Sequence, residues 1–264
     1  MRRARGRRRL YAIEVTHWQI EVPRLPVAFT GLRLAQLSDI HHGLYMPLEH
    51  VAAAVELANR LEPDLVALTG DFVSHSRKYI EPVAEVLGRL CAPLGVFAVL
   101  GNHDFRVGAN RVVAALAHHG IEVLRNRHVR VARDSASLCV AGVDGVRDAE
   151  ANLRQALQGV GTEATTFLLC HNPAILPCAA AYDIKLVLSG HTHGGQVGLG
   201  RLRRLAATRG LSLPFAHGWQ EFNGTQLYIS RGLGTVILPI RFRCPAEIPL
   251  LQFRPSSGSR RAQP

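Results

Sequence analysis

The chain has 264 residues, a length that fits one large domain or two small ones. Hydrophobic residues make up 47% of it and charged residues only 19%, which excludes a mainly disordered protein. The formal net charge is +11, but six arginines within the first nine residues account for more than half of it. The rest of the chain therefore has only a mild basic bias, which argues against a nucleic-acid-binding composition.

The sequence also indicates in which cellular compartment the protein is found. No apolar run approaches the ~20 residues that a membrane span needs, and residues 11–22 alternate like a strand instead of forming the apolar core of an export signal. The five cysteines never occur as C-x-x-C, which favours free thiols in a reducing compartment. We therefore expect a cytoplasmic protein. Residues 1–9 are either a solvated tail or an attachment to anionic lipid at the inner membrane face, worth about 1 kcal/mol per basic residue.

Hydrophobic periodicity predicts alternating strands and helices. The expected strands are residues 11–22, 32–37, 65–69, 95–100, 121–124, 128–132, 138–143, 166–170, 184–189 and 226–230, with a further β region near the C-terminus. The expected helices are residues 51–61, 80–90, 110–119 and 149–157. Continuously apolar strands indicate a sheet covered on both faces, and the middle hairpins indicate a second sheet. We expect one domain at residues 10–254, with disordered tails at 1–9 and 255–264.

Polar side chains follow five of these apolar strands, at the point where each strand ends. They are Asp39 and His41, then Asp71, then Asn102, His103 and Asp104, then His171, and last His191 and His193. Ligands in open α/β sheets collect beyond the carboxyl ends of the strands, so we expect these groups to converge. Carboxylates, imidazoles and an amide oxygen without a thiolate suit Mn, Fe or Zn.

The number of candidate ligands indicates two divalent metal ions. Asp39 and His41 are two residues apart on an extended chain, so they face the same side and can share one ion. Asp71 is the natural candidate to bridge both ions, because a carboxylate has two oxygens. The second ion would take Asn102, His171 and one of the histidines 191 and 193, which leaves the other for the first ion.

In these motifs the sequence resembles the calcineurin-like metallophosphoesterases. The matching motifs are Asp39-Ile40-His41, Gly70-Asp71, Gly101-Asn102-His103-Asp104, the lone His171 and Gly190-His191-Thr192-His193. The run that continues from His193 through Gly194-Gly195-Gln196-Val197 is similar to the bacterial YkuE/YaeI branch. That branch is related to enzymes that cleave the pyrophosphate of UDP-2,3-diacylglucosamine.

The resemblance implies roles for these residues and a fold. It assigns the first metal to Asp39, His41, Asp71 and His193, and the second to Asp71, Asn102, His171 and His191. It implies that His103 acts as general acid or transition-state stabiliser and that Asp104 orients the His103 ring. The implied fold is α/β, a four-layer α/β/β/α sandwich of two mixed β-sheets flanked by helices.

The expected activity is that of a binuclear-metal-dependent phosphohydrolase, most simply a phosphodiesterase or pyrophosphohydrolase using a metal-bridging hydroxide. A protonated His103 would serve the leaving oxygen, and no covalent intermediate is expected. A nuclease could use the same metals, but aromatic residues are only 6% of the chain and do not interleave with the arginines. A phosphomonoesterase would need an arginine soon after the metal-binding strands to bind the monoester phosphate, and the sequence does not identify one. A non-catalytic metal-binding scaffold would have lost ligands, and none is lost here.

One long connection, residues 198–219, follows directly after His193 and mixes leucines with arginines. Connections of this length in a compact domain are usually functional, although this one could also pack on its own leucines. Together with the basic residues 1–9, it leads us to expect a lipid-linked phosphodiester or pyrophosphate substrate at a membrane surface.

Overall fold

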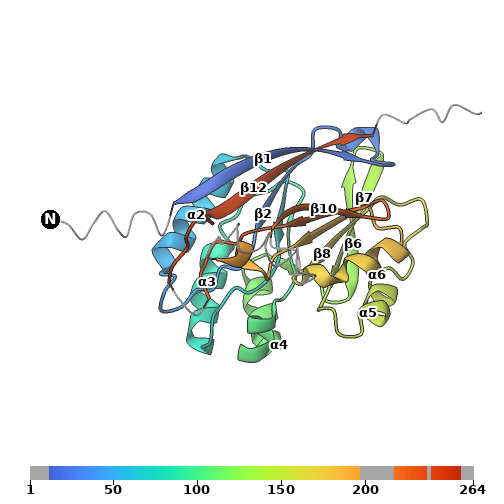
Figure 1. Ribbon diagram of the computed structural model, residues 1–264. Coiled ribbons are helices and arrows are strands. Elements are labelled where there is room, and N and C mark those ends of the chain that lie inside the picture. Colours follow the sequence, from blue (N-terminus) through green and yellow to red (C-terminus); the bar gives the residue numbers. More distant parts are fainter. Residues whose placement is uncertain (1–11, 197–216, 237–238, 257–264) are drawn as a thin grey trace, which may run out of the picture.

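The computed structural model describes residues 12–196, 217–236 and 239–256. Within these residues two six-stranded sheets pack face to face, and helices cover the outer face of each sheet (Figure 1). The expected α/β class and four-layer sandwich are therefore confirmed. In the parts of the chain that the structure describes, no helix has both the length and the apolar character needed to cross a bilayer.

The first sheet is built mainly from the N-terminal half of the chain. Its strands, in spatial order, are β1 (Ile13–Val22), β12 (Ala246–Pro255), β2 (Arg33–Leu37), β3 (Leu65–Leu68), β4 (Val96–Ala98) and β5 (Glu122–Val123). From β2 to β5 neighbouring strands are parallel, whereas β12 is antiparallel to β2 and parallel to β1. The carboxyl ends of β2, β3 and β4 therefore lie along one edge.

The second sheet repeats this arrangement with the later strands. Its order is β10 (Gly218–Phe222), β11 (Thr225–Ile229), β9 (Leu186–Ser189), β8 (Thr166–Cys170), β7 (Ala136–Val143) and β6 (Arg127–Arg133). Strands β11, β9, β8 and β7 are parallel to one another, and β10 and β6 are antiparallel edge strands. The carboxyl ends of β8 and β9 lie next to each other in consequence.

Strand β3 shows why the central strands are continuously apolar. Leu65 and Ala67 point into the core between the two sheets, where they pack in the same cluster as Phe167 and Leu186 of the second sheet. The alternate residues of β3 belong to the core beneath the helices of the first sheet. These helices are α2 (Leu48–Arg60), α3 (Ile80–Leu87) and α4 (Asn102–His118), whereas α5 (Ala149–Ala156) and α6 (Leu176–Ala181) cover the second sheet. Both faces of each central strand are thus buried.

Four short 3₁₀ helices complete the described chain: η1 (Val27–Phe29), η2 (Arg77–Tyr79), η3 (Pro173–Ile175) and η4 (His193–Gly195). Two expectations need correction. Helix α4 begins at Asn102, not near residue 110, and its axis is interrupted at Gly108, where φ is 128°. Because of that break and the polar residues before it, the first part of α4 does not show the regular spacing of apolar residues by which a helix is predicted from sequence. Strand β12 also continues to Pro255, one residue into the expected tail.

Several expected features lie outside the described residues. These are the basic residues 1–9, most of the 255–264 tail and most of the 198–219 connection. The end of that connection is described, and there the expectation was wrong, because Gly218 and Trp219 belong to strand β10. The Trp219 ring packs against that of Tyr228 at a tilt of 56°, with ring centroids 4.9 Å apart.

Candidate metal centre

All seven candidate metal ligands follow the carboxyl ends of central strands of the two sheets. Asp39 and His41 come after β2, Asp71 after β3 and Asn102 after β4, in the first sheet. The remaining three, His171, His191 and His193, follow β8 and β9 in the second sheet. The site therefore lies where the strand ends of both sheets meet, and the expected convergence is confirmed by the contacts described below.

The backbone at these positions is strained. Five of the seven candidates have positive φ although none is glycine: Asp39 (50°), His41 (51°), Asp71 (57°), His191 (73°) and His193 (52°). Such conformations cost on the order of 1–3 kcal/mol each and persist where surrounding contacts enforce them, typically at functional sites. Asp39 and His41 were expected on an extended chain, and the positive φ at both residues shows that the backbone there is not extended.

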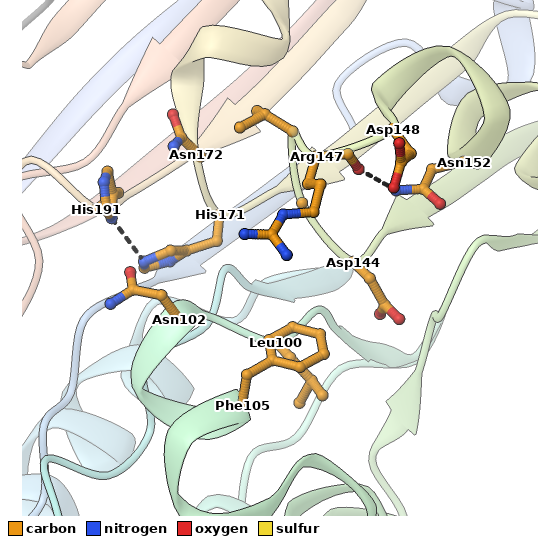
Figure 2. A pocket seen from close by; sticks show the side chains of 12 residues that line it. Leu100, Asn102, Phe105, Asp144, Arg147, Asp148, Asn152, His171, Asn172 and His191 are labelled. Atoms are coloured by element: carbon orange, nitrogen blue, oxygen red, sulfur yellow. Dashed lines mark hydrogen bonds between the residues drawn. The ribbon is translucent and has the colours of Figure 1, made fainter.

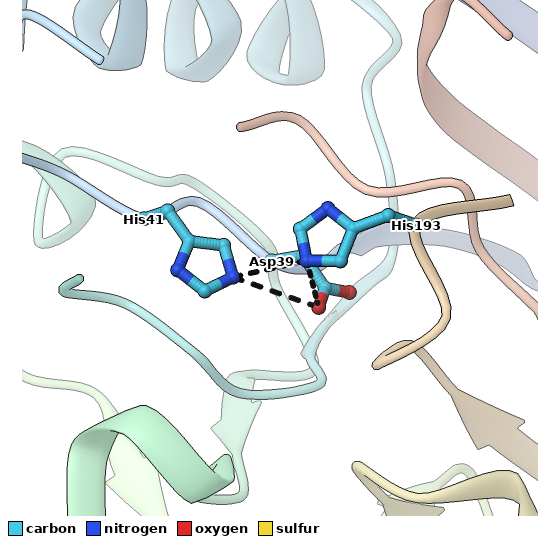
Figure 3. A group of neighbouring side chains, drawn as sticks. All are labelled: Asp39, His41 and His193. Atoms are coloured by element: carbon cyan, nitrogen blue, oxygen red, sulfur yellow. Dashed lines mark hydrogen bonds and ion pairs between the residues drawn. The ribbon is translucent and has the colours of Figure 1, made fainter. Parts of the chain in front are cut away.

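One group of side chains consists of Asp39, His41 and His193, all of them buried (Figure 3). The Nε2 atoms of His41 and His193 are 3.0 Å apart, and His193 Nε2 lies 3.2 Å from Oδ1 of Asp39. Two imidazole nitrogens and a carboxylate oxygen so close together form a donor set suited to one cation.

A second group lies on the other side of Asp71. Nε2 of His171 is 3.2 Å from Nδ1 of His191 and 3.3 Å from Oδ2 of Asp71. The same Oδ2 atom is 3.4 Å from Nε2 of His41 in the first group. Asp71 thus stands between the two groups, in the position expected of a bridging ligand.

Asn102 supplies a direct check on whether these residues suit a metal. Its Oδ1 atom is buried and has no hydrogen-bond partner among the described residues. A buried carbonyl oxygen without a partner costs about 1–3 kcal/mol, and a cation would satisfy it. Asn102 lines the same cavity as His171 and His191. The donors of the second group therefore fit an oxygen- and nitrogen-binding divalent ion.

Burial and charge set the protonation of the imidazoles. Burial lowers the pKa of His41 to about 3, assisted by His193 and only partly opposed by Asp71. His41 is therefore neutral, which is the form that binds metal. Burial also disfavours charge on His171, but the charge and hydrogen bond of Asp71 outweigh it and raise the pKa of His171 to about 9. Metal uptake there must displace a proton, so affinity should increase with pH.

Backbone and hydroxyl groups orient these side chains, and sequence reasoning missed them. Nδ1 of His171 lies 2.7 Å from the Thr69 carbonyl oxygen. A carbonyl oxygen only accepts, so Nδ1 carries the proton and Nε2 is left facing Asp71. Ser38 donates to Oδ2 of Asp39 at 2.6 Å. The Thr69 partner carries no signal in the sequence, because it depends on which strands become neighbours, whereas Ser38 is next to Asp39 in the chain.

Two glycines are required by close approach. A Cβ atom on Gly190 would lie 2.2 Å from Oδ2 of Asp39, and one on Gly101 would lie 2.1 Å from Oδ1 of Asp71. Both distances are far inside van der Waals contact. The glycine in each motif therefore lets the backbone of one strand end pass directly against a carboxylate from another.

The role expected for Asp104 needs correction. Among the described residues, its carboxylate makes no hydrogen bond to the His103 ring. It accepts hydrogen bonds from the backbone N–H groups of Asp71 (2.8 Å), Phe72 (2.9 Å) and Gly101 (2.9 Å). Asp104 is in the first turn of α4, where a carboxylate is favoured, and it fastens the strand end that carries Asp71 to the helix. It is a positioning residue for Asp71.

The His103 ring is oriented by a different group. Its Nδ1 atom lies 2.7 Å from the carbonyl oxygen of Ser74, and its backbone N–H donates to Oδ1 of Asp71 at 2.8 Å. The ring meets that of His41 edge-on, with centroids 4.8 Å apart. His103 is thus beside the first group of ligands, with Nε2 free of the hydrogen bond to Ser74.

The comparisons with known proteins agree with this geometry. A family model described as "Calcineurin-like phosphoesterase" matches residues 32–195. An uncharacterized metallophosphoesterase of Aquifex aeolicus is 33% identical over 254 residues, which cover 92% of this chain and 93% of that protein. The uncharacterized metallophosphoesterase YkuE of Bacillus subtilis is 29% identical over 248 residues, which cover 92% of this chain and 86% of YkuE.

Two further similarities are informative. A "Transmembrane protein with metallophosphoesterase domain" of Danio rerio is 34% identical over 252 residues, 89% of this chain, and the chain spans 56% of that protein's length. Among solved structures, TT1561 of Thermus thermophilus has a TM-score of 0.51 at 14% identity, covering 77% of this chain and 91% of that one. The structural likeness supports the fold, and the sequence matches support the family. The chain therefore belongs to the calcineurin-like phosphoesterases and is a metal-dependent phosphoester hydrolase.

Proposed function

We propose that the protein hydrolyses phosphodiesters or pyrophosphates with two divalent ions bound between its sheets. The position of Asp71 carries this proposal, because its Oδ2 atom lies within 3.4 Å of imidazole nitrogens from both ligand groups. The first ion would be held by Asp39, His41, Asp71 and His193, and the second by Asp71, Asn102, His171 and His191. The donors include no thiolate, which favours Mn, Fe or Zn.

The residues around the ions divide the remaining work. When bound, two such ions supply a water of lowered pKa and neutralise charge on the phosphoryl oxygens. His103 offers a ring nitrogen within 4.8 Å of donor atoms of His41 and Asp71. Its Nδ1 proton is held by Ser74, so Nε2 is the atom that can carry a proton to the leaving oxygen. Asp104 holds the backbone of Asp71 against the first turn of α4.

Hydrolysis of two model substrates tests the proposal. Protein freed of metal with a chelator should be inactive, and adding back Mn, Fe(II) or Zn should restore hydrolysis of bis(p-nitrophenyl) phosphate more than that of p-nitrophenyl phosphate. Hydrolysis should depend on metal because the ions provide both the nucleophile and the neutralisation of charge on the phosphoryl oxygens. Full activity without metal would contradict the proposal, and a preference for the monoester would favour the phosphomonoesterase alternative.

We further propose that the substrate is amphiphilic and is reached at the cytoplasmic membrane surface. Exposed apolar side chains near the ligands support this: Leu44 is 69% exposed, and Ile240 and Phe242 are each 52% exposed. Leu44 follows three residues after His41. The Phe242 N–H donates to the carbonyl of Gln196, which is three residues beyond His193. Apolar groups near a site, combined with the basic residues 1–9, are what lipid attachment requires.

Vesicle binding tests the membrane proposal. Full-length protein should bind anionic vesicles at low salt, and high salt should weaken the binding because surface charges are screened within about 8 Å at physiological ionic strength. Deleting residues 1–9 should abolish it, and Leu44→Ser with Ile240→Ser should weaken it in the full-length protein. Neutral phosphatidylcholine vesicles are the control. Hydrolysis of soluble diesters should not respond to the deletion. Protein that ignores anionic vesicles at low salt would contradict this proposal alone.

A further inference from the structure

A cavity of about 520 Å³ lies beside the second group of candidate ligands. One side is formed by Asn102, His171 and His191, and another by the segment 144–148 between β7 and α5 (Figure 2). Its volume is within the range of small-molecule sites. Because one wall consists of candidate ligands themselves, the cavity is directly beside the place where the second ion would bind.

Arg147 is the arginine in this lining. Figure 2 shows its side chain extending into the cavity, with His171 on one side and Phe105 on the other. Among the described residues its guanidinium makes no hydrogen bond or ion pair (nearby hydrogen bonds involve only its backbone). Asp148 lines the same cavity without forming an ion pair with it. The electrostatic energy of a guanidinium next to a metal ion is most favourable when an anion lies between these two positive groups.

The backbone that carries Arg147 is held in place. The side-chain amide of Asn152 donates to the Arg147 carbonyl at 3.0 Å, and Asn126 donates to Oδ1 of Asn152 at 3.0 Å. Asn126 in turn accepts from the N–H of Asp144 at 3.0 Å. Both ends of the segment are thus tied to one asparagine pair. The segment presents Arg147 at a fixed place while leaving its side chain free.

One of the two carboxylates in the wall, Asp144, is already neutralised. Asp144 accepts hydrogen bonds from Nε and Nη2 of Arg125, the shortest being 2.7 Å. The Arg125 guanidinium also lies over the Phe105 ring, 5.7 Å from its centroid. Arg125 therefore joins α4 to the 144–148 segment and removes the Asp144 carboxylate as a competitor for Arg147. Of the remaining charged groups in the lining, Arg147 has a guanidinium without a hydrogen bond or ion pair among the described residues, and this group is available to an anionic ligand.

We propose that Arg147 binds a second anionic group of the substrate, separate from the phosphate that is hydrolysed. It would be a specificity-determining residue, recognising a phosphate or carboxylate attached within the cavity's reach of the scissile phosphate. Guanidinium binds such planar or trigonal oxyanions through two parallel hydrogen bonds. The inference rests on the proposed function, because it places the scissile phosphate at the second ion.

Calorimetric titration of the metal-loaded full-length protein tests this without turnover. The probes are alkylphosphonates, ω-phosphonocarboxylates and α,ω-diphosphonates with spacers of two to five carbons. At the best spacer, a second anion should tighten binding by about 10-fold or more relative to the alkylphosphonate, since one charged hydrogen-bonding pair contributes about 1.5–3 kcal/mol. The carboxylate and phosphonate series distinguish which anion the site takes.

Variants then assign the effect to Arg147. Arg147→Ala should remove the advantage of the second anion, and Arg147→Lys should keep only part of it, because lysine lacks the two-pronged donor. Arg89→Ala is the matched control, an exposed arginine just beyond the end of α3 that pairs with Glu85. Equal binding of mono- and dianions at every spacer would overturn the inference, as would an unchanged advantage in Arg147→Ala. Loss of alkylphosphonate binding itself would instead count against the proposed metal site.

Discussion

Replacing Asp71 is expected to remove metal binding and hydrolysis together. Its Oδ2 atom lies 3.3 Å from Nε2 of His171 and 3.4 Å from Nε2 of His41, and its Oδ1 atom accepts the backbone N–H of His103. Loss of this carboxylate leaves two groups of imidazoles without the anion between them. Changes to mere outer partners of metal ligands cost about 10–100-fold, so loss of a bridging ligand should cost more than ~100-fold in kcat/KM.

Two variants separate this effect from misfolding. Asp71 has φ of 57°, a conformation that asparagine tolerates better than alanine does. Asp71→Asn should therefore keep the thermal unfolding temperature near that of the wild type, while metal analysis shows both ions depleted. Asp71→Ala should lose metal and also some stability. An Asp71→Asn protein that retains two ions and near-normal activity would rule out a bridging role.

Much of the site could be predicted because its signals are local. Each candidate ligand directly follows a run such as Leu65–Leu68, whose unbroken apolar character arises from burial of both faces. Once those runs are read as parallel strands, the ends of β2, β3 and β4 must lie along one edge. The later histidines follow strands of the second sheet, and they reach Asp39 and Asp71 because the two sheets pack face to face, an arrangement that only the family resemblance implied.

The parts that could not be predicted depend on contacts between distant segments. Asp104 and the N–H of Asp71 are 33 residues apart in sequence, and nothing local shows that this carboxylate serves the backbone instead of the His103 ring. The Arg147 cavity has the same origin. Its walls come from α4, from the 144–148 segment and from the ends of β8 and β9. A lone arginine in a turn has no periodicity or motif that would mark it.

His103→Ala should lower the rate by about 10²–10⁴-fold while both ions stay bound, because proton transfer by a positioned side chain contributes that much. Its Nδ1 is held by the Ser74 carbonyl at 2.7 Å, so Nε2 is the ring nitrogen left for proton donation. The loss should be smallest for p-nitrophenolate, which needs little protonation, and should grow as the leaving alcohol becomes more basic.

A matched control exists in His128, whose Nδ1 also lies 2.7 Å from a carbonyl oxygen, that of Ala156. His128→Ala loses the same kind of histidine–carbonyl hydrogen bond, but His128 lies on the edge strand β6, bonds to the last residue of α5 and is not one of the candidate ligands. It should therefore leave the rate unchanged for every leaving group.

If metal analysis shows that His103→Ala releases an ion, His103 is a ligand and not an acid. A rate loss that is equal for good and poor leaving groups would instead assign His103 to charge stabilisation of the transition state, because only proton donation depends on the basicity of the leaving oxygen.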